Sequence, residues 1–217
     1  MSTPVSRVLT DPKDPKLATG VLLESGEELK ADVVVCNADL VWAMNNLFGE
    51  PTPYAKRLDK KPVSCSSISF YWSIDRSVHP SPSQRRRTDS DNRVVPELSI
   101  HNIFLADEYR QSFESIFNDH SMPAEPSFYL NVPSRIDPSA APAGRDSIVV
   151  LVPVGHISAN LPEGSDWKVI VDKARDHVYE TLEKRLGLKD LRKWTINEMV
   201  NDPISWQEKV RFLPTLR

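Results

Sequence analysis

The stretch that decides the fold is residues 65–74, which read CSSISFYWSI. Large apolar side chains alternate strictly with hydroxyl-bearing ones. The apolar set is Ile68, Phe70, Trp72 and Ile74, and the hydroxyl set is Ser67, Ser69, Tyr71 and Ser73. Because successive side chains of a strand point to opposite faces, this pattern predicts a strand with one apolar face and one hydroxyl-rich face. The sequence leaves open which of the two faces packs on helices.

The segments that follow predict more strands and two helices. Residues 127–132 repeat the alternation, and the apolar run 148–154 predicts a more fully buried strand. Three such strands predict an antiparallel or mixed sheet. Residues 106–118 carry Tyr109, Phe113, Ile116 and Phe117 at helical spacing, which favours a helix with an aromatic core stripe. Residues 165–186 predict a long amphipathic helix that begins at an N-cap, Ser165, and ends before Gly187.

Towards the N-terminus, residues 5–36 predict a β-meander followed by a buried strand. The hairpin is ATGVLLESGEEL (18–29), and the run ADVVVC (31–36) is Val-rich, as in a strand buried on both faces of an α/β sheet. Asn37 or Asp39 is suited to cap the helix that follows. The carboxyl end of such a strand is where α/β sheets bind ligands, but without a neighbouring glycine loop the pattern favours a well-capped packing element.

The order of elements predicts an α/β (α+β) protein in two parts. Residues 51–62 are polar and proline-rich, so we place a domain boundary there, between residues 1–50 and 51–217. Residues 79–93 (HPSPSQRRRTDSDNR) contain no apolar side chain to bury and are expected to form a mobile surface insertion.

Composition excludes several classes of function. Lys plus Arg is 27 against 30 for Asp plus Glu, a net charge of −3, which argues against nucleic-acid binding. The seven glycines are too far apart for either glycine-rich phosphate-binding motif. The five histidines contain no zinc motif, so no metal is assigned. The two cysteines form no C-x-x-C pair, which favours a reducing, intracellular setting. No motif identifies a catalytic residue.

Three segments together resemble the carotenoid desaturase family, the phytoene desaturases of the bacterial and fungal type. They are ATGVLLESGEELKADVVVCNADLV (18–41), HNIFLADEYRQSFESIF (101–117) and EPSFYLNVPSRIDPSAAPAGRDSIVVLVPV (125–154). A long helix and INEMVNDPISW (196–206) follow as they do in the family. The arginine-rich insertion is more similar to fungal members than to bacterial ones.

The resemblance implies a later portion of an FAD-binding domain in residues 1–50 and a substrate domain in residues 51–217. It implies an uncharged polyene substrate, FAD as cofactor and peripheral contact with a membrane. Related flavoproteins use a backbone position equivalent to Val5 at the adenine edge, and they make backbone contacts to the cofactor at Asn37, Ala38 and Asp39. The family's glycine fingerprint for the FAD pyrophosphate is absent here, so the chain is expected to be an internal fragment that binds FAD poorly by itself.

Three functions stay open at this point. The first is an FAD-dependent enzyme that converts phytoene towards lycopene. The second is another flavin oxidoreductase or isomerase of the amine-oxidase-like group that acts on a different lipid. The third is a non-catalytic remnant that binds lipid or a partner.

Overall fold

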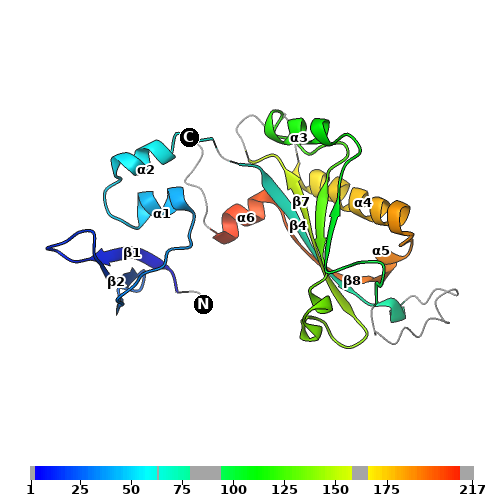
Figure 1. Ribbon diagram of the computed structural model, residues 1–217, viewed down its shortest axis with the longest axis horizontal. Helices are drawn as coiled ribbons and strands as arrows, with labels where there is room; N and C mark the ends of the chain where they lie inside the picture. The colour runs from blue at the N-terminus through cyan, green and yellow to red at the C-terminus, as the bar shows by residue number, and fades with distance from the viewer. Residues whose placement is uncertain (1–2, 63, 79–93, 158–165, 211–217) are drawn as a thin grey trace. The chain divides into compact units, whose positions relative to one another are not determined.

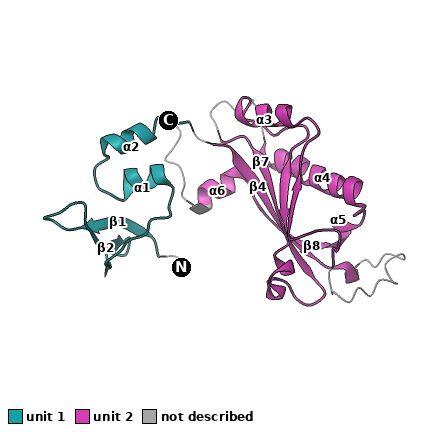
Figure 2. Ribbon diagram, viewed as in Figure 1, with its two compact units in different colours: residues 1–63, 210–217 teal, residues 64–209 magenta. Residues whose placement is uncertain are grey.

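The computed structural model describes residues 3–62, 64–78, 94–157 and 166–210, and it forms two compact units (Figure 1). Residues 1–63 and 210–217 make up unit 1, and residues 64–209 make up unit 2 (Figure 2). The expected insertion at residues 79–93 and the expected cap Ser165 lie outside the described residues.

Unit 1 contains a three-stranded antiparallel sheet and two short helices. The elements are β1 (Val5–Thr10), β2 (Ala18–Leu23), β3 (Glu28–Lys30), α1 (Leu40–Asn46) and α2 (Pro53–Leu58). The meander and the hairpin predicted from the sequence are therefore confirmed. At Gly20 a Cβ atom would come 2.2 Å from the Leu29 carbonyl oxygen, so only glycine lets β2 and β3 approach this closely.

The buried strand predicted at residues 31–36 is wrong. This run is not a strand, and Val33 and Val35 are 74% and 86% exposed. Val34 alone packs, against a small cluster of Val8, Ala43 and Leu47. A strand needs a neighbour that completes its backbone hydrogen bonds, and β3 ends at Lys30 without another strand of the described residues beside this run. Cys36 is accordingly exposed rather than inside a strand.

Unit 2 is built on a five-stranded sheet in the order β5-β6-β7-β4-β8. The strands are β4 (Ser66–Ile74), β5 (His101–Phe104), β6 (Phe128–Asn131), β7 (Asp146–Val154) and β8 (Thr195–Asn201). All four pairings are antiparallel, so the structure selects the antiparallel form of the sheet that the sequence predicted. β4 lies inside the sheet, because it pairs with β7 along its whole length and with β8 on its other edge.

The apolar face of β4 is the core face of unit 2. Ile68, Phe70, Trp72 and Ile74 are almost fully buried in one cluster with α4 (Trp167–Leu186) and α5 (Leu191–Trp194). The Asp166 side chain caps α4 by accepting from the Lys168 N–H, one residue later than the predicted cap. Gly187 ends the helix in the left-handed conformation, as predicted.

Two burial patterns differ from the sequence prediction. β7 is buried on alternate residues rather than throughout, and Leu151 faces solvent. α3 (Tyr109–Phe117) turns Ser112 and Ile116 inward, whereas its aromatic residues are exposed, so the predicted aromatic core stripe is wrong. Periodicity gives the spacing of a helix face, but it does not say which face meets the protein. The remaining elements are α6 (Pro203–Val210) and three short 3-10 helices at Arg76–Val78, Pro133–Arg135 and Pro138–Ala140.

Candidate functional site

The face of the unit 2 sheet opposite α4 is the candidate functional site, and we call it the open face. The strand register places its side chains in two rows that cross all five strands. The first row is Ile103, Tyr129, Leu151, Ser69 and Asn201, and the second row is His101, Asn131, Val149, Tyr71 and Met199. With strands about 4.8 Å apart, each row is roughly 19 Å long.

The open face is apolar and hydroxyl-bearing, without charged side chains in either row. Ile103 and Met199 are 73% and 51% exposed, and Leu151 is also exposed, whereas Ser69 and Asn201 near the β8 edge are buried. Exposed apolar side chains gathered on one sheet face indicate a binding surface. A surface with this composition can contact a long, uncharged molecule, because such a molecule offers nothing for a charged side chain to bind.

One polar cluster lies at the β5–β6 side of the open face. The Tyr129 hydroxyl lies 2.6 Å from His101 Nδ1, and the Asn131 amide nitrogen lies 3.3 Å from the same atom. Asn131 also donates to the Ile100 carbonyl oxygen at 2.9 Å. The Tyr129 contact is the shorter of the two, and the hydroxyl can donate to Nδ1 when that nitrogen carries no proton. The tyrosine and histidine together can take up and pass on a proton.

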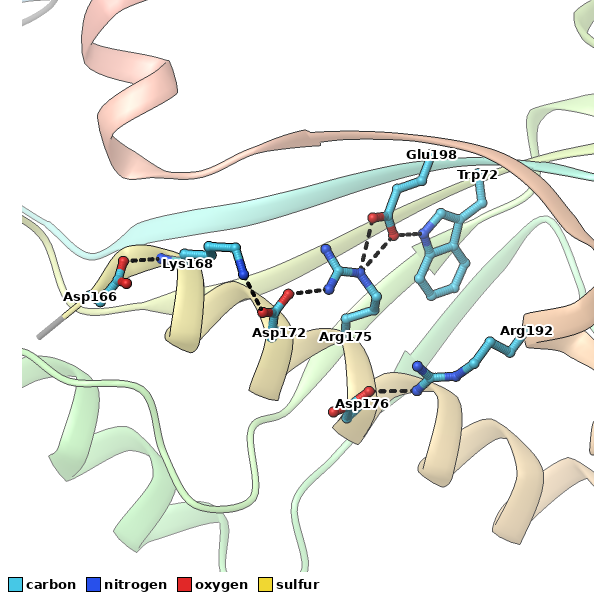
Figure 3. Close-up of polar contacts among 8 residues, drawn as sticks. All are labelled: Trp72, Asp166, Lys168, Asp172, Arg175, Asp176, Arg192 and Glu198. Carbon is cyan, nitrogen blue, oxygen red and sulfur yellow. Dashed lines mark hydrogen bonds and ion pairs between the residues drawn. The ribbon is translucent and has the colours of Figure 1, made fainter.

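A chain of polar contacts holds α4 against the other face of the sheet (Figure 3). Glu198 of β8 accepts from Trp72 Nε1 at 2.7 Å and from Arg175 Nε at 2.9 Å. Arg175 also donates to Asp172. Trp72 stacks on Tyr179 with 4.4 Å between ring centroids. These contacts join β4, β8 and α4, so they fix the backbone that displays the open face.

The electrostatics of this support follow from hydrogen bonding and burial. The Arg175 hydrogen bond lowers the pKa of Asp172 below its usual value. Burial alone would lower the pKa of Arg175, but its hydrogen bonds to Glu198 and Asp172 raise it. Burial raises the pKa of Tyr179 to about 12, against an opposing hydrogen bond from Thr195. The ion pairs therefore stay charged and Tyr179 stays neutral at ordinary pH.

A buried ion pair anchors the start of β7. Arg135 binds Asp146 through two hydrogen bonds of 2.6 and 3.0 Å, and both side chains are nearly inaccessible. Asp146 also accepts from the backbone N–H groups of Val94 and Val95. Every oxygen of the carboxylate is thus used, which is what a buried charge requires.

The residues that the resemblance assigned to the cofactor lie in unit 1. Val5 begins β1 and packs partly against the Val8, Ala43 and Leu47 cluster. Asn37, Ala38 and Asp39 lie in the exposed segment before α1. Asp39 caps α1 by accepting from the Trp42 N–H at 2.9 Å, which confirms one of the two predicted caps. Val34, three residues before Asn37, packs against the same cluster as Val5, whereas Asn37 and Ala38 are exposed.

These four residues do not by themselves fit the pyrophosphate of a dinucleotide. The N–H groups at the start of α1 face the Asp39 carboxylate, whose negative charge would repel a phosphate. Unit 1 also lacks the tight glycine turn that brings backbone N–H groups close to phosphates. A backbone contact from Val5 to an adenine edge stays a prediction.

The described ranges are 3–62, 64–78, 94–157 and 166–210. Within them, no three histidine, cysteine or carboxylate side chains gather in a way that could hold a metal ion. In the same part of the chain, no helix combines the length and the apolar character needed to cross a membrane.

The sequence missed the His101 cluster. Alternation in residues 127–132 did place Tyr129 and Asn131 on the polar side of their strand. His101 is some thirty residues away along the chain, and its position opposite Asn131 depends on the β5–β6 register, which no local pattern contains.

Comparison with known proteins supports the resemblance seen in the sequence, although no family model matches the chain. The phytoene desaturase of Phycomyces blakesleeanus is 49% identical over 206 residues, which are 95% of this chain and 32% of that protein. The zeta-carotene-forming phytoene desaturase of Myxococcus xanthus is 38% identical over 87% of this chain and 31% of that protein. An oxidoreductase of known structure from Methanosarcina mazei aligns over 92% of this chain and 36% of its own, with 12% identity and a TM-score of 0.39.

The chain thus spans about a third of the length of the curated relatives that it matches. Identity near one half, sustained across both units, is far above what chance or a shared fold produces. The chain is a homologue of the fungal phytoene desaturases over this part of their sequence.

Proposed function

We propose that this chain forms part of an FAD-dependent oxidoreductase that introduces double bonds into a carotenoid precursor, converting phytoene towards lycopene. The observation that carries the proposal is the 49% identity to a protein named phytoene desaturase, sustained over 95% of the chain. Unit 1 then belongs to the cofactor side of that enzyme and unit 2 to the substrate side.

The open face supports the substrate half of the proposal. A polyene hydrocarbon has no group that forms strong hydrogen bonds, so it must be held by contact area and shape. The two uncharged rows of the open face supply such contact across five strands. We infer that the polyene lies along this face.

The His101 cluster supports a role in proton transfer. Each desaturation removes two hydrogens from adjacent carbons. One leaves as a hydride, which a bound flavin would accept, and the other leaves as a proton. Tyr129 can accept that proton while passing its own to His101 Nδ1, 2.6 Å away. Asn131 lies beside the same ring, and its amide nitrogen donates to the Ile100 carbonyl oxygen.

A peripheral contact with the membrane completes the proposal. Phytoene dissolves in the hydrocarbon of a bilayer, so an enzyme that acts on it must draw its substrate from lipid. The chain then works at the membrane surface, with the open face receiving the substrate.

The competing functions make different predictions in one experiment. The chain replaces the matching third of the Phycomyces blakesleeanus phytoene desaturase, and the chimera is expressed in cells that accumulate phytoene. We expect the chimera to form desaturated carotenoids, measured by chromatography of the cell extract. A flavin-loaded chimera that leaves phytoene unchanged would contradict the proposed reaction and favour another lipid substrate or a non-catalytic role.

Two variants of the chimera test the cluster separately. Tyr129→Phe removes the hydroxyl and is expected to lower the turnover number by roughly 10²-fold or more, the usual contribution of a positioned proton acceptor. Tyr71→Phe is the matched control. It also removes a hydroxyl from the open face, but Tyr71 is not part of the His101 cluster. Equal activity of the two variants would remove Tyr129 from the mechanism.

A further inference from the structure

Two histidines meet where β7 ends. His120 lies in the segment that follows α3, which we call loop 118–123, and His156 comes two residues after β7. Their rings touch edge to face, with centroids 4.3 Å apart. The Nδ1 atom of His120 is buried, and the described part of the chain offers it no hydrogen-bond partner. The His120 ring is therefore held by packing against His156 rather than by a hydrogen bond at Nδ1.

The backbone at this contact is strained and closely packed. Among the described residues, His120 is the one non-glycine residue with a positive φ angle, 49°. Side chains other than glycine seldom adopt this left-handed conformation, and the surrounding contacts must offset its cost. At Gly155 a Cβ atom would come 2.1 Å from the His120 carbonyl carbon, so only glycine lets the end of β7 approach the loop this closely.

Hydrogen bonds tie loop 118–123 to its neighbours on both sides. The Gly155 N–H donates to the Ser121 carbonyl oxygen at 3.1 Å, which fastens the loop to the end of β7. The Ser121 N–H donates to the Ser115 carbonyl oxygen at 3.0 Å, which fastens the loop to α3. The histidine contact and the Gly155 hydrogen bond together hold the C-terminal end of α3 at the end of β7.

The surroundings of His156 disfavour its protonated form. Burial lowers the pKa of His156 below the usual 6.5, and the charge that His120 can carry lowers it further. A ring whose pKa is lowered in the folded state contributes stability above pH 6.5, and it loses that contribution as the pH falls below this value. The contact between the two rings is therefore strongest at neutral pH.

The other charged groups around the pair do not offset this effect. Asp119, next to His120, is exposed, so water screens its charge. Glu114 of α3 pairs with Arg110. On β4, which pairs with the end of β7, the residue that precedes Ser66 is Cys65, which offers neither a carboxylate nor a basic group. Within the described residues, His120 is thus the titratable group that acts on His156.

We propose that the contact between His120 and His156 is a pH-sensitive latch, which holds loop 118–123 on the end of β7 at neutral pH and releases it in mildly acidic solution. Protonation of His156 puts a positive charge on a partly buried ring that faces a second imidazole. Water solvates that charge best when the loop moves away. Release also relieves the left-handed conformation of His120, so the strained residue favours opening once the contact is lost.

Hydrogen exchange of the full chain tests the latch. The probes are the Gly155 and Ser121 N–H groups, followed by NMR from about pH 7 to about pH 5 and expressed as protection factors, which remove the pH dependence of the intrinsic exchange rate. We expect both factors to fall about threefold or more, within the limit of about tenfold per pH unit that one bound proton allows. The Val150 N–H, in the middle of β7, should keep its protection.

Three variants assign the effect to the pair. His156→Phe keeps an aromatic ring beside His120 and removes the group that titrates, so protection should stay high throughout the pH range. His120→Asn removes the ring and keeps a residue that tolerates a positive φ, so Gly155 should be less protected at neutral pH and less sensitive to acid. His101→Gln is the matched control, because it removes an imidazole of unit 2 outside the latch, and it should behave as the wild type does. Circular dichroism checks that every variant is folded.

Either of two outcomes would overturn the proposal. One is a wild-type protection factor at Gly155 that does not change with pH, a result that needs no variant. The other is a His156→Phe protein whose Gly155 and Ser121 N–H groups lose protection in acid as those of the wild type do. The assay uses neither flavin nor phytoene, so failure of the proposed desaturase reaction would leave this result unaffected.

Discussion

Trp72 takes part both in the packing of the core and in a network of polar contacts. Its ring is buried and stacks on Tyr179, while its Nε1 donates to Glu198, which is also bound by Arg175. A buried indole normally finds a partner for its N–H, and here that partner lies on the neighbouring strand. The residue therefore couples the core of unit 2 to the ion pairs that hold α4.

Replacing Trp72 is expected to cost much more than replacing the residue before it. Trp72→Ala should lower the free energy of unfolding by about 3–5 kcal/mol, the usual cost of emptying a large buried aromatic site. Tyr71→Ala, on the open face, should cost about 1 kcal/mol. Denaturant unfolding of both variants measures the difference. Similar losses would mean that the two faces of β4 are not divided into core and open surface.

The residues of β4 could be assigned to faces from the sequence, but not to roles. Alternation separated Trp72 from Tyr71 correctly because the period of a strand is two. Which face meets the helices depends on α4, which begins more than ninety residues later. The sequence therefore predicted the existence of two faces, and only the structure identified the apolar one as the core.

Among the elements, α4 was predicted best and the run 31–36 worst. α4 is long, amphipathic and ended by a glycine, so its own sequence contains most of what defines it. The Val-rich run has strand composition but no partner strand among the described residues of unit 1. The α3 error has a similar origin, because the aromatic face was assumed to be the buried one. A local sequence pattern indicates whether a segment favours a strand or a helix. The partner strand or packing surface that it needs lies elsewhere in the chain.

The docking of α4 on the sheet should depend on pH through Tyr179. Burial raises its pKa from 10.0 to about 12, so the folded state holds the proton more tightly than the unfolded state. Its contribution to stability is complete below pH 10 and is lost as the pH rises from 10 to about 12. The loss amounts to roughly 2–3 kcal/mol. Denaturant unfolding of the wild type and of Tyr179→Phe across this range measures it.

The phenylalanine variant isolates the tyrosine from other groups that titrate at high pH. It keeps the ring that stacks on Trp72 and loses the hydroxyl that binds Thr195. We expect its stability to fall less steeply above pH 10 than that of the wild type. Parallel curves for the two proteins would show that Tyr179 ionises normally.

At the scale of the whole molecule, the two units differ in the size of the hydrophobic core that their own residues form. Unit 2 contains a core of large side chains from the sheet and α4, and its buried Arg135 and Asp146 side chains form an ion pair. The described residues of unit 1 form a small cluster and leave Val33 and Val35 exposed. A domain stabilised by its own core unfolds cooperatively, so the stability of the chain should reside mainly in unit 2.

The residues of unit 1 predict how the isolated chain behaves towards flavin. Purified alone, it should not retain FAD, because Asp39 occupies the N-terminus of α1 and the glycine spacing provides no phosphate turn. Visible absorbance of the purified protein, and flavin fluorescence after denaturation, measure the retained cofactor. Under the proposed function the Phycomyces blakesleeanus chimera should be yellow, which makes it the positive control. Stoichiometric FAD on the chain alone would mean that Val5, Asn37 and Ala38 offer enough backbone contacts to hold a dinucleotide without a glycine-rich turn.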